Sequence, residues 1–213
     1  MYLTEIILQD EFAVRLFPSN PYDWHRSIWS FFPNKSERDF LYRVDSNSRG
    51  VRLLILSETR PLSPFAEDNA VFRCKEIPEH FLSHKLYRFQ IRVNPTKRIK
   101  VDARTGNRIE KGIRVPITDE VELLQWFKRK GEAGGFSLPA CYDGEDNGTQ
   151  LTILPEARLN FQKPANKRAH HASVQFTGIL RVDDTNLFIQ TLRHGIGSAK
   201  SFGFGLLMLQ PLN

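Results

Sequence analysis

The sequence has few cysteines and no long apolar run, and each shortage excludes a class of protein. Its 213 residues contain only two cysteines, Cys74 and Cys141, which stand far apart and belong to no CxxC pair. A disulfide framework and a cysteine-based zinc site are therefore not expected. No apolar stretch approaches the roughly 20 residues that a membrane-spanning helix needs. Residues 1–8 are too short and too acidic for a signal peptide, so we expect a globular, cytoplasmic protein.

Acidic residues are scarce over one long stretch of the chain. Between Lys85 and Arg114 ten basic residues face only two acids, an excess larger than the net charge of +6 for the whole chain. A second cluster has no acid at all and is made of Arg158, Lys163, Lys167 and Arg168. A solvated surface is the ordinary reading of such runs, but the aromatic residues interleaved with both clusters favour a polyanion as partner.

The spacing of apolar residues predicts the same order of elements twice. The first half is expected to contain a strand at 2–8, a helix at 21–32, strands at 39–45 and 51–57, a weak helix near 64–70 and a strand near 71–77. The second half is expected to contain a strand at 86–93, a helix at 118–130, strands near 136–142, 151–162 and 173–182, a helix at 185–194 and a strand at 205–209.

Caps and turns support these boundaries. Thr118 is the expected N-cap of the helix at 118–130 and Gly131 follows its end, while Gly195 is the expected C-cap of the last helix and Pro211 ends the last strand. The βαββαβ order, repeated, predicts an α+β protein of two tandem ferredoxin-like (RRM-like) domains. Their boundaries are expected at residues 1–84 and 85–213.

The segment 195–205 carries four glycines around Lys200, after a helix and before a strand. Dinucleotide-binding and Walker loops have the opposite polarity, because they follow a strand and open a helix. Glycines let backbone N–H groups approach a phosphate closely, and Ser198 and Ser201 add hydroxyl groups. Capping and close packing account for Gly195 and at most Gly205, so two glycines are left without a structural reason.

Six motifs are spread along the chain: NPYDWHR at 20–26, WSFFPN at 29–34, RDFL at 38–41, RFQIRVNPTK at 88–97, RVP at 114–116 and the glycine-rich segment. In order and spacing they resemble the CasE (Cse3) family of CRISPR endoribonucleases. The resemblance runs from residue 1 to residue 211 and implies two ferredoxin-like folds. It also implies cleavage of CRISPR repeat RNA beside its stem-loop without a metal or other cofactor, and retention of the product within the type I-E Cascade complex.

Two residues at the start of the chain suit this chemistry. RNA cleavage without a metal requires removal of the 2′-OH proton, stabilisation of charge on the phosphate, and protonation of the leaving 5′-oxygen. Tyr22 and His25 are three residues apart on the expected helix 21–32, so both project from one face. A lone helix histidine is usually structural, but the resemblance implies that His25 is catalytic with Tyr22 beside it. Either residue can be the base or the acid.

Further residues are expected to contact RNA. Lys200 is the best candidate for a phosphate contact near the cleavage site, and Arg26 either reaches the RNA backbone or forms a salt bridge. The resemblance implies that the basic segment around 158–168 is a hairpin that docks on the RNA stem. The full set of expected RNA contacts is Arg26, Lys97, Arg98, Lys163, Lys167, Arg168, Gly197, Ser198, Lys200 and Ser201.

Two alternatives to a repeat-specific endoribonuclease remain open. One is a related RNA-binding subunit that does not cut. The other is a metal-dependent nuclease, which is the weaker alternative because no carboxylate-rich helix or DxD-type pair accompanies the basic face.

Overall fold

The computed structural model describes residues 1–8, 21–47, 50–63, 70–101, 105–139, 151–163 and 167–212. Its elements follow in the order β1 (Tyr2–Leu8), α2 (Pro21–Trp29), β2 (Phe40–Asn47), β3 (Gly50–Ser57), β4 (Ala70–Glu76), α3 (Glu79–Leu82), β5 (Leu86–Val93), β6 (Thr96–Val101), β7 (Arg108–Pro116), α4 (Glu120–Ala133), β8 (Phe136–Ser137), β9 (Leu151–Lys163), β10 (Lys167–Val182), α5 (Thr185–His194), the 3₁₀ helix η1 (Lys200–Phe202) and β11 (Leu207–Leu212). No described helix is long and apolar enough to cross a membrane.

The first half of the chain forms a four-stranded antiparallel sheet with the strand order β2-β3-β1-β4. Helix α2 covers one face, where Ile28 and Phe31 pack with Ile6, Leu53 and Ile55. The central strand β3 is buried on both faces, because Leu54 and Leu56 on its other side contact the second half of the molecule. Burial on both faces explains why β3 reads as a nearly continuous apolar run.

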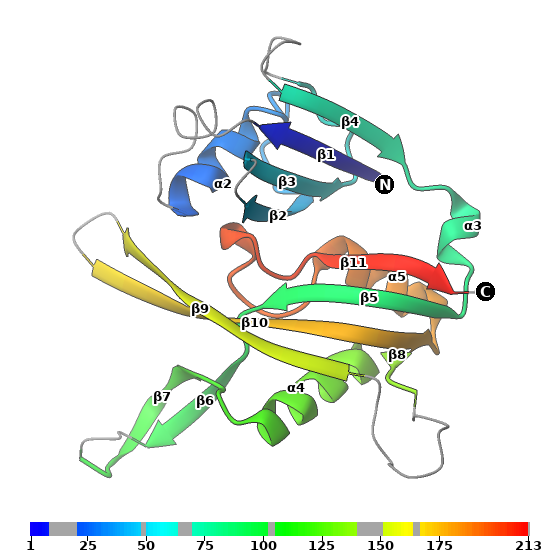
Figure 1. The fold of residues 1–213 in the computed structure, drawn as a ribbon. Coiled ribbons are helices and arrows are strands. Elements are labelled where there is room, and N and C mark those ends of the chain that lie inside the picture. The colour runs from blue at the N-terminus through cyan, green and yellow to red at the C-terminus, as the bar shows by residue number, and fades with distance from the viewer. Residues whose placement is uncertain are drawn as a thin grey trace.

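The second half forms a sheet with the order β11-β5-β10-β8, to which β9 is added by pairing with β10. Strand β5 alternates strictly, and its buried residues Phe89 and Ile91 face a core that includes Phe127 of α4 and Phe188 of α5. Figure 1 shows β9 and β10 extending as a long two-stranded arm below α2, with the separate β6–β7 hairpin beneath it.

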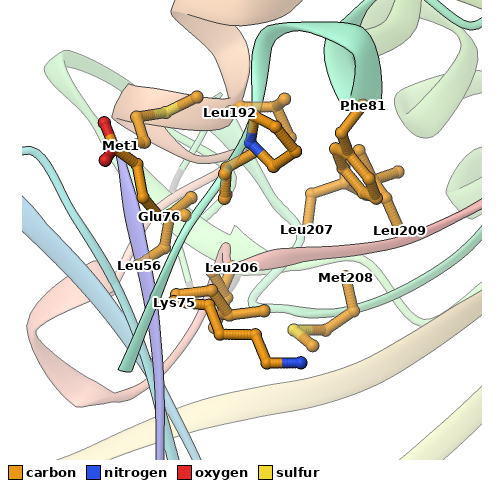
Figure 2. A pocket seen from close by; sticks show the side chains of 13 residues that line it. Met1, Leu56, Lys75, Glu76, Phe81, Leu192, Leu206, Leu207, Met208 and Leu209 are labelled. Atoms are coloured by element: carbon orange, nitrogen blue, oxygen red, sulfur yellow. The ribbon is translucent and has the colours of Figure 1, made fainter. Parts of the chain in front are cut away.

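The two sheets meet through apolar and charged contacts. Leu206, which precedes β11, packs on Leu41, Leu54 and Leu56 of the first sheet. An apolar pocket of ≈ 190 Å³ lies at this junction, and Figure 2 shows its lining, which includes Leu56, Met208 and, from α3, Phe81. Arg92 of β5 crosses the junction as well, donating to the carbonyl oxygen of Val44 at 2.8 Å.

The predicted bounds of strands 2–8 and 86–93 and of helix 185–194 are confirmed. The helix expected at 21–32 ends at Trp29, where Ser30, Phe31 and Phe32 continue as a tighter turn with i→i−3 hydrogen bonds. Pro33 explains the early end, because it has no N–H to donate to the Trp29 carbonyl and it disfavours the helical region for Phe32.

Three expected boundaries in the second half are wrong. The N-cap of α4 is Asp119 and not Thr118, since the Asp119 carboxylate accepts from the backbone N–H of Glu122 at 2.9 Å. Gly131 lies inside α4 with no room for a Cβ against Phe136, and the helix is capped by Gly134. Pro211 does not end the last strand but lies within β11, where it is tolerated because β11 is an edge strand.

Two further strands of the second half differ from those expected. Strand β8 covers two residues, Phe136–Ser137, where a strand to residue 142 was expected, and β11 begins at Leu207. The weak helix expected near 64–70 falls almost entirely outside the described residues.

Candidate functional site

His25 lies in the second turn of α2 with its ring among aromatic side chains. The ring centroids of Trp29 and Phe40 each lie 6.2 Å from that of His25, and Tyr42 is stacked on it at 6.4 Å. The indole N–H of Trp29 donates to Nε2 of His25 at 3.3 Å, whereas Nδ1 is buried without a hydrogen-bond partner among the described residues. A ring nitrogen that accepts is unprotonated, so the proton of the neutral imidazole is on Nδ1.

The surroundings of His25 keep its imidazole neutral. Burial is the largest cause and lowers the pKa of His25 below its ordinary value, because the charged form loses hydration. The positive charge of Arg38 lowers the pKa of His25 further. A neutral imidazole near pH 7 can accept a proton at Nε2 once the bond to Trp29 is released.

The glycine-rich loop is fixed beside this helix by two hydrogen bonds to one residue. Nη1 of Arg38 donates to Oγ of Ser201 at 2.9 Å, and the hydroxyl of Tyr42 donates to the Ser201 carbonyl at 2.7 Å. Helix α2 packs against η1, which begins at Lys200. Two of the residues expected to bind RNA, Lys200 and Ser201, are therefore placed next to the helix that carries His25.

Lys200 is half-buried and surrounded by positive charge. Burial lowers the pKa of Lys200, and Arg38 and Lys130 lower it further. Ala199, directly before it, is the single non-glycine residue with positive φ within the described ranges. Strained backbone of this kind gathers at functional sites, and like charges held together favour an anionic ligand.

All four glycines of the loop have a structural reason, contrary to the expectation from sequence. Gly195, Gly197, Gly203 and Gly205 have φ between 71° and 87°, a region that side chains disfavour. At Gly205 a Cβ would also lie 2.7 Å from the carbonyl oxygen of Ile196. The glycines alone therefore do not indicate a phosphate.

A basic cleft of ≈ 330 Å³ lies at the other end of the same loop. It brings together four residues that the sequence predicts to bind RNA: Lys97, Arg98, Gly197 and Ser198. Lys97 is partly neutralised, because its Nζ donates to Oε1 of Glu122 at 2.7 Å. Arg114 and Lys130 complete the charge of the cleft.

Other expected residues lie elsewhere in the fold. Arg26 is exposed on α2 and forms no ion pair with a described residue, so both readings of Arg26 stay predictions. Lys163 and Lys167 are backbone register partners at the end of the β9–β10 arm, and Arg168 follows Lys167 along β10. Their side chains, and that of Tyr22 in the first turn of α2, lie outside the described residues.

Arg38 and Lys130 were missed as site residues. Arg38 belongs to the RDFL motif, but its distance from His25 in sequence gives no sign that the two are neighbours. Lys130 reads simply as a cation in the last turn of a helix. Within the described ranges, no group of three His, Cys, Asp or Glu side chains could hold a metal ion.

Comparison with known proteins gives a family. A family model described as "CRISPR associated protein" matches residues 1–211. The chain is 30% identical to the CRISPR system Cascade subunit CasE of Escherichia coli over 222 residues, covering 100% of both chains. The chain belongs to the CasE (Cse3) family.

Two further relatives extend this result. The CRISPR-associated endoribonuclease Cse3 of Thermus thermophilus is 31% identical over 225 residues, covering 99% of this chain and 100% of the relative. A solved structure of CRISPR endoribonuclease Cse3 bound to 19 nt RNA superposes with a TM-score of 0.80 at 29% identity, covering 99% and 100% of the two chains. The family resemblance predicted from the six motifs is confirmed.

Proposed function

We propose that this CasE-family protein is an endoribonuclease that cuts CRISPR precursor RNA beside the repeat stem-loop and stays bound to the product as a Cascade subunit. Full-length similarity to a Cascade subunit and to a named endoribonuclease supports this proposal. The observation that carries it is the position of His25, a neutral imidazole beside a loop that gathers Arg38, Lys200 and Ser201.

The two halves are proposed to be tandem ferredoxin-like domains, residues 1–84 and 85–213. In a ferredoxin-like sheet the first strand lies between the third and the fourth. The order β2-β3-β1-β4 has this form, and so does β11-β5-β10 with β8 or β9 at its far edge. Each half has its own buried core, which supports the division.

The proposed reaction is an attack of the RNA on itself. The 2′-oxygen bonds to the adjacent phosphorus as it loses its proton to a base, and the bond from phosphorus to the 5′-oxygen breaks as that oxygen takes a proton. The products are a 2′,3′-cyclic phosphate and a 5′-OH end. Charge that develops on the phosphate is balanced by Arg38 and Lys200, which are already in place before the reaction.

His25 and Tyr22 are proposed to carry the two proton steps. A neutral His25 with a lowered pKa is ready to take the 2′-OH proton through Nε2. Tyr22 precedes His25 by three residues on α2, a spacing that puts both on one face of the helix, and it is proposed to act on the same phosphate. The opposite assignment, in which Tyr22 is the base and His25 the acid, requires His25 to gain a proton first.

One observation favours the alternative of an RNA-binding subunit that does not cut. Nε2 of His25 is occupied by the indole N–H of Trp29, and the ring is packed by Phe40 and Tyr42. A ring held in this way serves the core well without any catalytic role. Catalysis through Nε2 requires the bound RNA to displace the indole N–H of Trp29. Such a displacement is a common event, because hydrogen bonds in free enzymes often rearrange when substrate binds.

Cleavage of cognate repeat RNA in EDTA tests the proposal. We expect cutting to continue under chelation, because an imidazole and a phenol need no metal for proton transfer, and we expect a 5′-OH product. A repeat with 2′-deoxy at the scissile nucleotide should bind and remain intact. Loss of cutting in EDTA that magnesium restores would indicate a metal-dependent nuclease, and tight binding without cutting would indicate the RNA-binding alternative.

A further inference from the structure

The basic cleft is lined by three separate parts of the chain. Its walls come from the start and end of the β6–β7 hairpin, from α4, and from the glycine-rich loop, and its residues are Asn94, Thr96, Lys97, Arg98, Arg114, Trp126, Lys130, Gly197 and Ser198. Four of these described residues are cations and none carries a carboxylate. The lining therefore attracts an anion.

Two arginines of the cleft are held in an unfavourable arrangement. Arg98 of β6 and Arg114 of β7 are direct register partners, and like charges directly opposite each other destabilise a strand pair. Neither forms an ion pair with a described residue, whereas the neighbouring Lys97 is paired with Glu122. Gly112 leaves the space that the Arg98 side chain uses, since a Cβ there would lie 2.7 Å from Arg98 Cγ. An anion between the guanidinium groups would relieve the repulsion.

The wall formed by the glycine-rich loop is fixed to the sheet. Nδ2 of Asn94, a buried residue, lies 3.3 Å from Oγ of Ser198, which in turn donates to the Asn94 carbonyl at 3.1 Å. His171 of β10 contacts the same amide, with Nδ1 3.1 Å away. These bonds fix the position of this wall relative to β5 and β10.

The cleft suits the backbone of a nucleic acid better than its bases. Trp126 is only 6% exposed and packs against Phe176 in the core, so it offers little ring surface for stacking. The groups that remain available are cationic nitrogens and the Thr96 hydroxyl, which bind phosphate. A volume of ≈ 330 Å³ is at the low end of small-ligand pockets, so the cleft itself holds only a short piece of one strand.

Positive charge is continuous from the cleft to His25. Ser198 in the cleft is three residues from Ser201, so their Cα atoms are at most about 11 Å apart. Lys200 lies between them, and its pKa is lowered by Lys130 on the cleft side and by Arg38 on the His25 side. An RNA strand with one phosphate beside His25 can therefore place a nearby phosphate in the cleft.

We propose that the cleft binds phosphates of the unpaired RNA that adjoins the scissile phosphate, through Arg98, Arg114 and Lys130. The inference rests on the proposed function, because it takes the RNA cut beside its stem-loop as the ligand. Two surfaces then bind two parts of the RNA: the β9–β10 arm contacts the stem, and the cleft contacts the single strand next to it.

The test compares two repeat RNAs, each with 2′-deoxy at the scissile nucleotide so that binding is measured without cutting. One is the stem-loop alone and the other is the stem-loop with its unpaired flanks. Arg114→Gln and Lys130→Gln should each weaken binding of the flanked RNA about five- to tenfold. Each should also reduce the slope of log K against log salt concentration by about 0.7 per lost contact. Binding of the bare stem-loop should stay within about twofold.

The chain offers matched controls for this test. Arg129→Gln removes an exposed charge one residue from Lys130 but outside the cleft, and should leave the binding of both RNAs unchanged. Arg114→Lys keeps the charge and should restore most of the binding. Because Arg114→Gln also relieves the pair with Arg98, the free protein should melt at the same temperature or higher.

Equal loss on both RNAs would overturn the inference, since the cleft would then contact the stem. Unchanged binding of both would overturn it as well, and would leave the cleft as a solvated surface or a site for an acidic protein. Neither outcome depends on cutting. If the wild-type protein binds but does not cut an all-ribose repeat, the proposed function fails while the result for the cleft stands.

Discussion

Nη1 of Arg38 donates to Oγ of Ser201 at 2.9 Å, across a separation of 163 residues in the sequence. The bond joins the segment before β2 to the glycine-rich loop, and it places one guanidinium group close enough to lower the pKa of both His25 and Lys200. Arg38 thus has two effects, one on the position of the loop and one on the charge of the residues around the expected phosphate.

Arg38→Gln should raise the pKa of His25. The positive charge of Arg38 opposes protonation of the imidazole, so its removal lets the pKa of His25 rise, although burial still holds it below the ordinary value. The limb of the pH–rate profile that reports His25 should therefore move to higher pH. NMR titration of His25 and single-turnover rates across pH 5 to 9 measure both effects.

The control for this variant is Arg73→Gln, which removes an exposed arginine of β4 that pairs with Glu5 at 3.3 Å, on another part of the first sheet. It should leave the pKa of His25 and the profile unchanged. A wild-type profile in Arg38→Gln, or the same shift in both variants, would show that Arg38 does not act on His25 specifically.

His25→Ala should lower the single-turnover cleavage rate by roughly a hundredfold or more, the scale of a lost general acid or base. Repeat affinity should change by only a few fold, because the imidazole acts mainly in the transition state and the cationic surfaces supply the affinity. Rates on pre-bound RNA and a binding isotherm measure the two quantities. Normal cutting would remove the catalytic role, and an equal loss of binding would make His25 a contact residue.

Tyr22→Phe distinguishes a proton-transfer role from an orienting one. If the phenol carries a proton step, its loss should lower the cleavage rate about as much as His25→Ala does; if it only orients the phosphate, the loss should be smaller. The same pre-bound rate measurement gives the answer. A rate equal to that of the wild-type protein would place Tyr22 outside the mechanism.

Local patterns were sufficient for much of the fold. Helix 185–194 was predicted to the residue, because Gly195 ends it with positive φ and its apolar positions recur at helical spacing. Strand β5 was predicted by its alternation. The N-cap of α4 is predicted wrongly because two local signals compete. Thr118 and Asp119 are both good N-cap residues, and in the structure Asp119 accepts the hydrogen bond from the backbone N–H of Glu122.

The candidate site could be predicted only in part. His25 came from a resemblance carried by a local motif, and the basic residues came from charge counting. Arg38 could not be inferred, since its role depends on how β2 meets η1, and no spacing in the sequence encodes that contact. The opposition of Arg98 and Arg114 likewise depends on the β6–β7 hairpin and its register, and no strand is predicted from the sequence at either position.

The β9–β10 arm should supply affinity for the stem. Changing Lys163, Lys167 and Arg168 together to alanine is expected to weaken stem-loop binding. It should also reduce the slope of log K against log salt concentration by about two to three, because binding releases about 0.9 counterion fewer for each phosphate contact that is lost. Affinity should fall more than the cleavage rate at saturating protein. Unchanged affinity and salt slope would show that these residues form a solvated surface.

Two glycines of the loop separate backbone strain from RNA contact. Gly205→Ala and Gly197→Ala both place a side chain at φ 87°, which costs about 1–2 kcal/mol of folding stability. Gly205→Ala should cost more, because its Cβ would lie 2.7 Å from the Ile196 carbonyl oxygen, whereas the Cβ at Gly197 would make an ordinary contact with Trp126 at 3.4 Å.

Gly197, however, lines the basic cleft, so Gly197→Ala should weaken binding of the flanked repeat RNA more than Gly205→Ala does. Denaturant unfolding gives the stabilities, and RNA titration of the folded variants gives the affinities. If both quantities fall in the same proportion for the two variants, the loop affects RNA only through its fold.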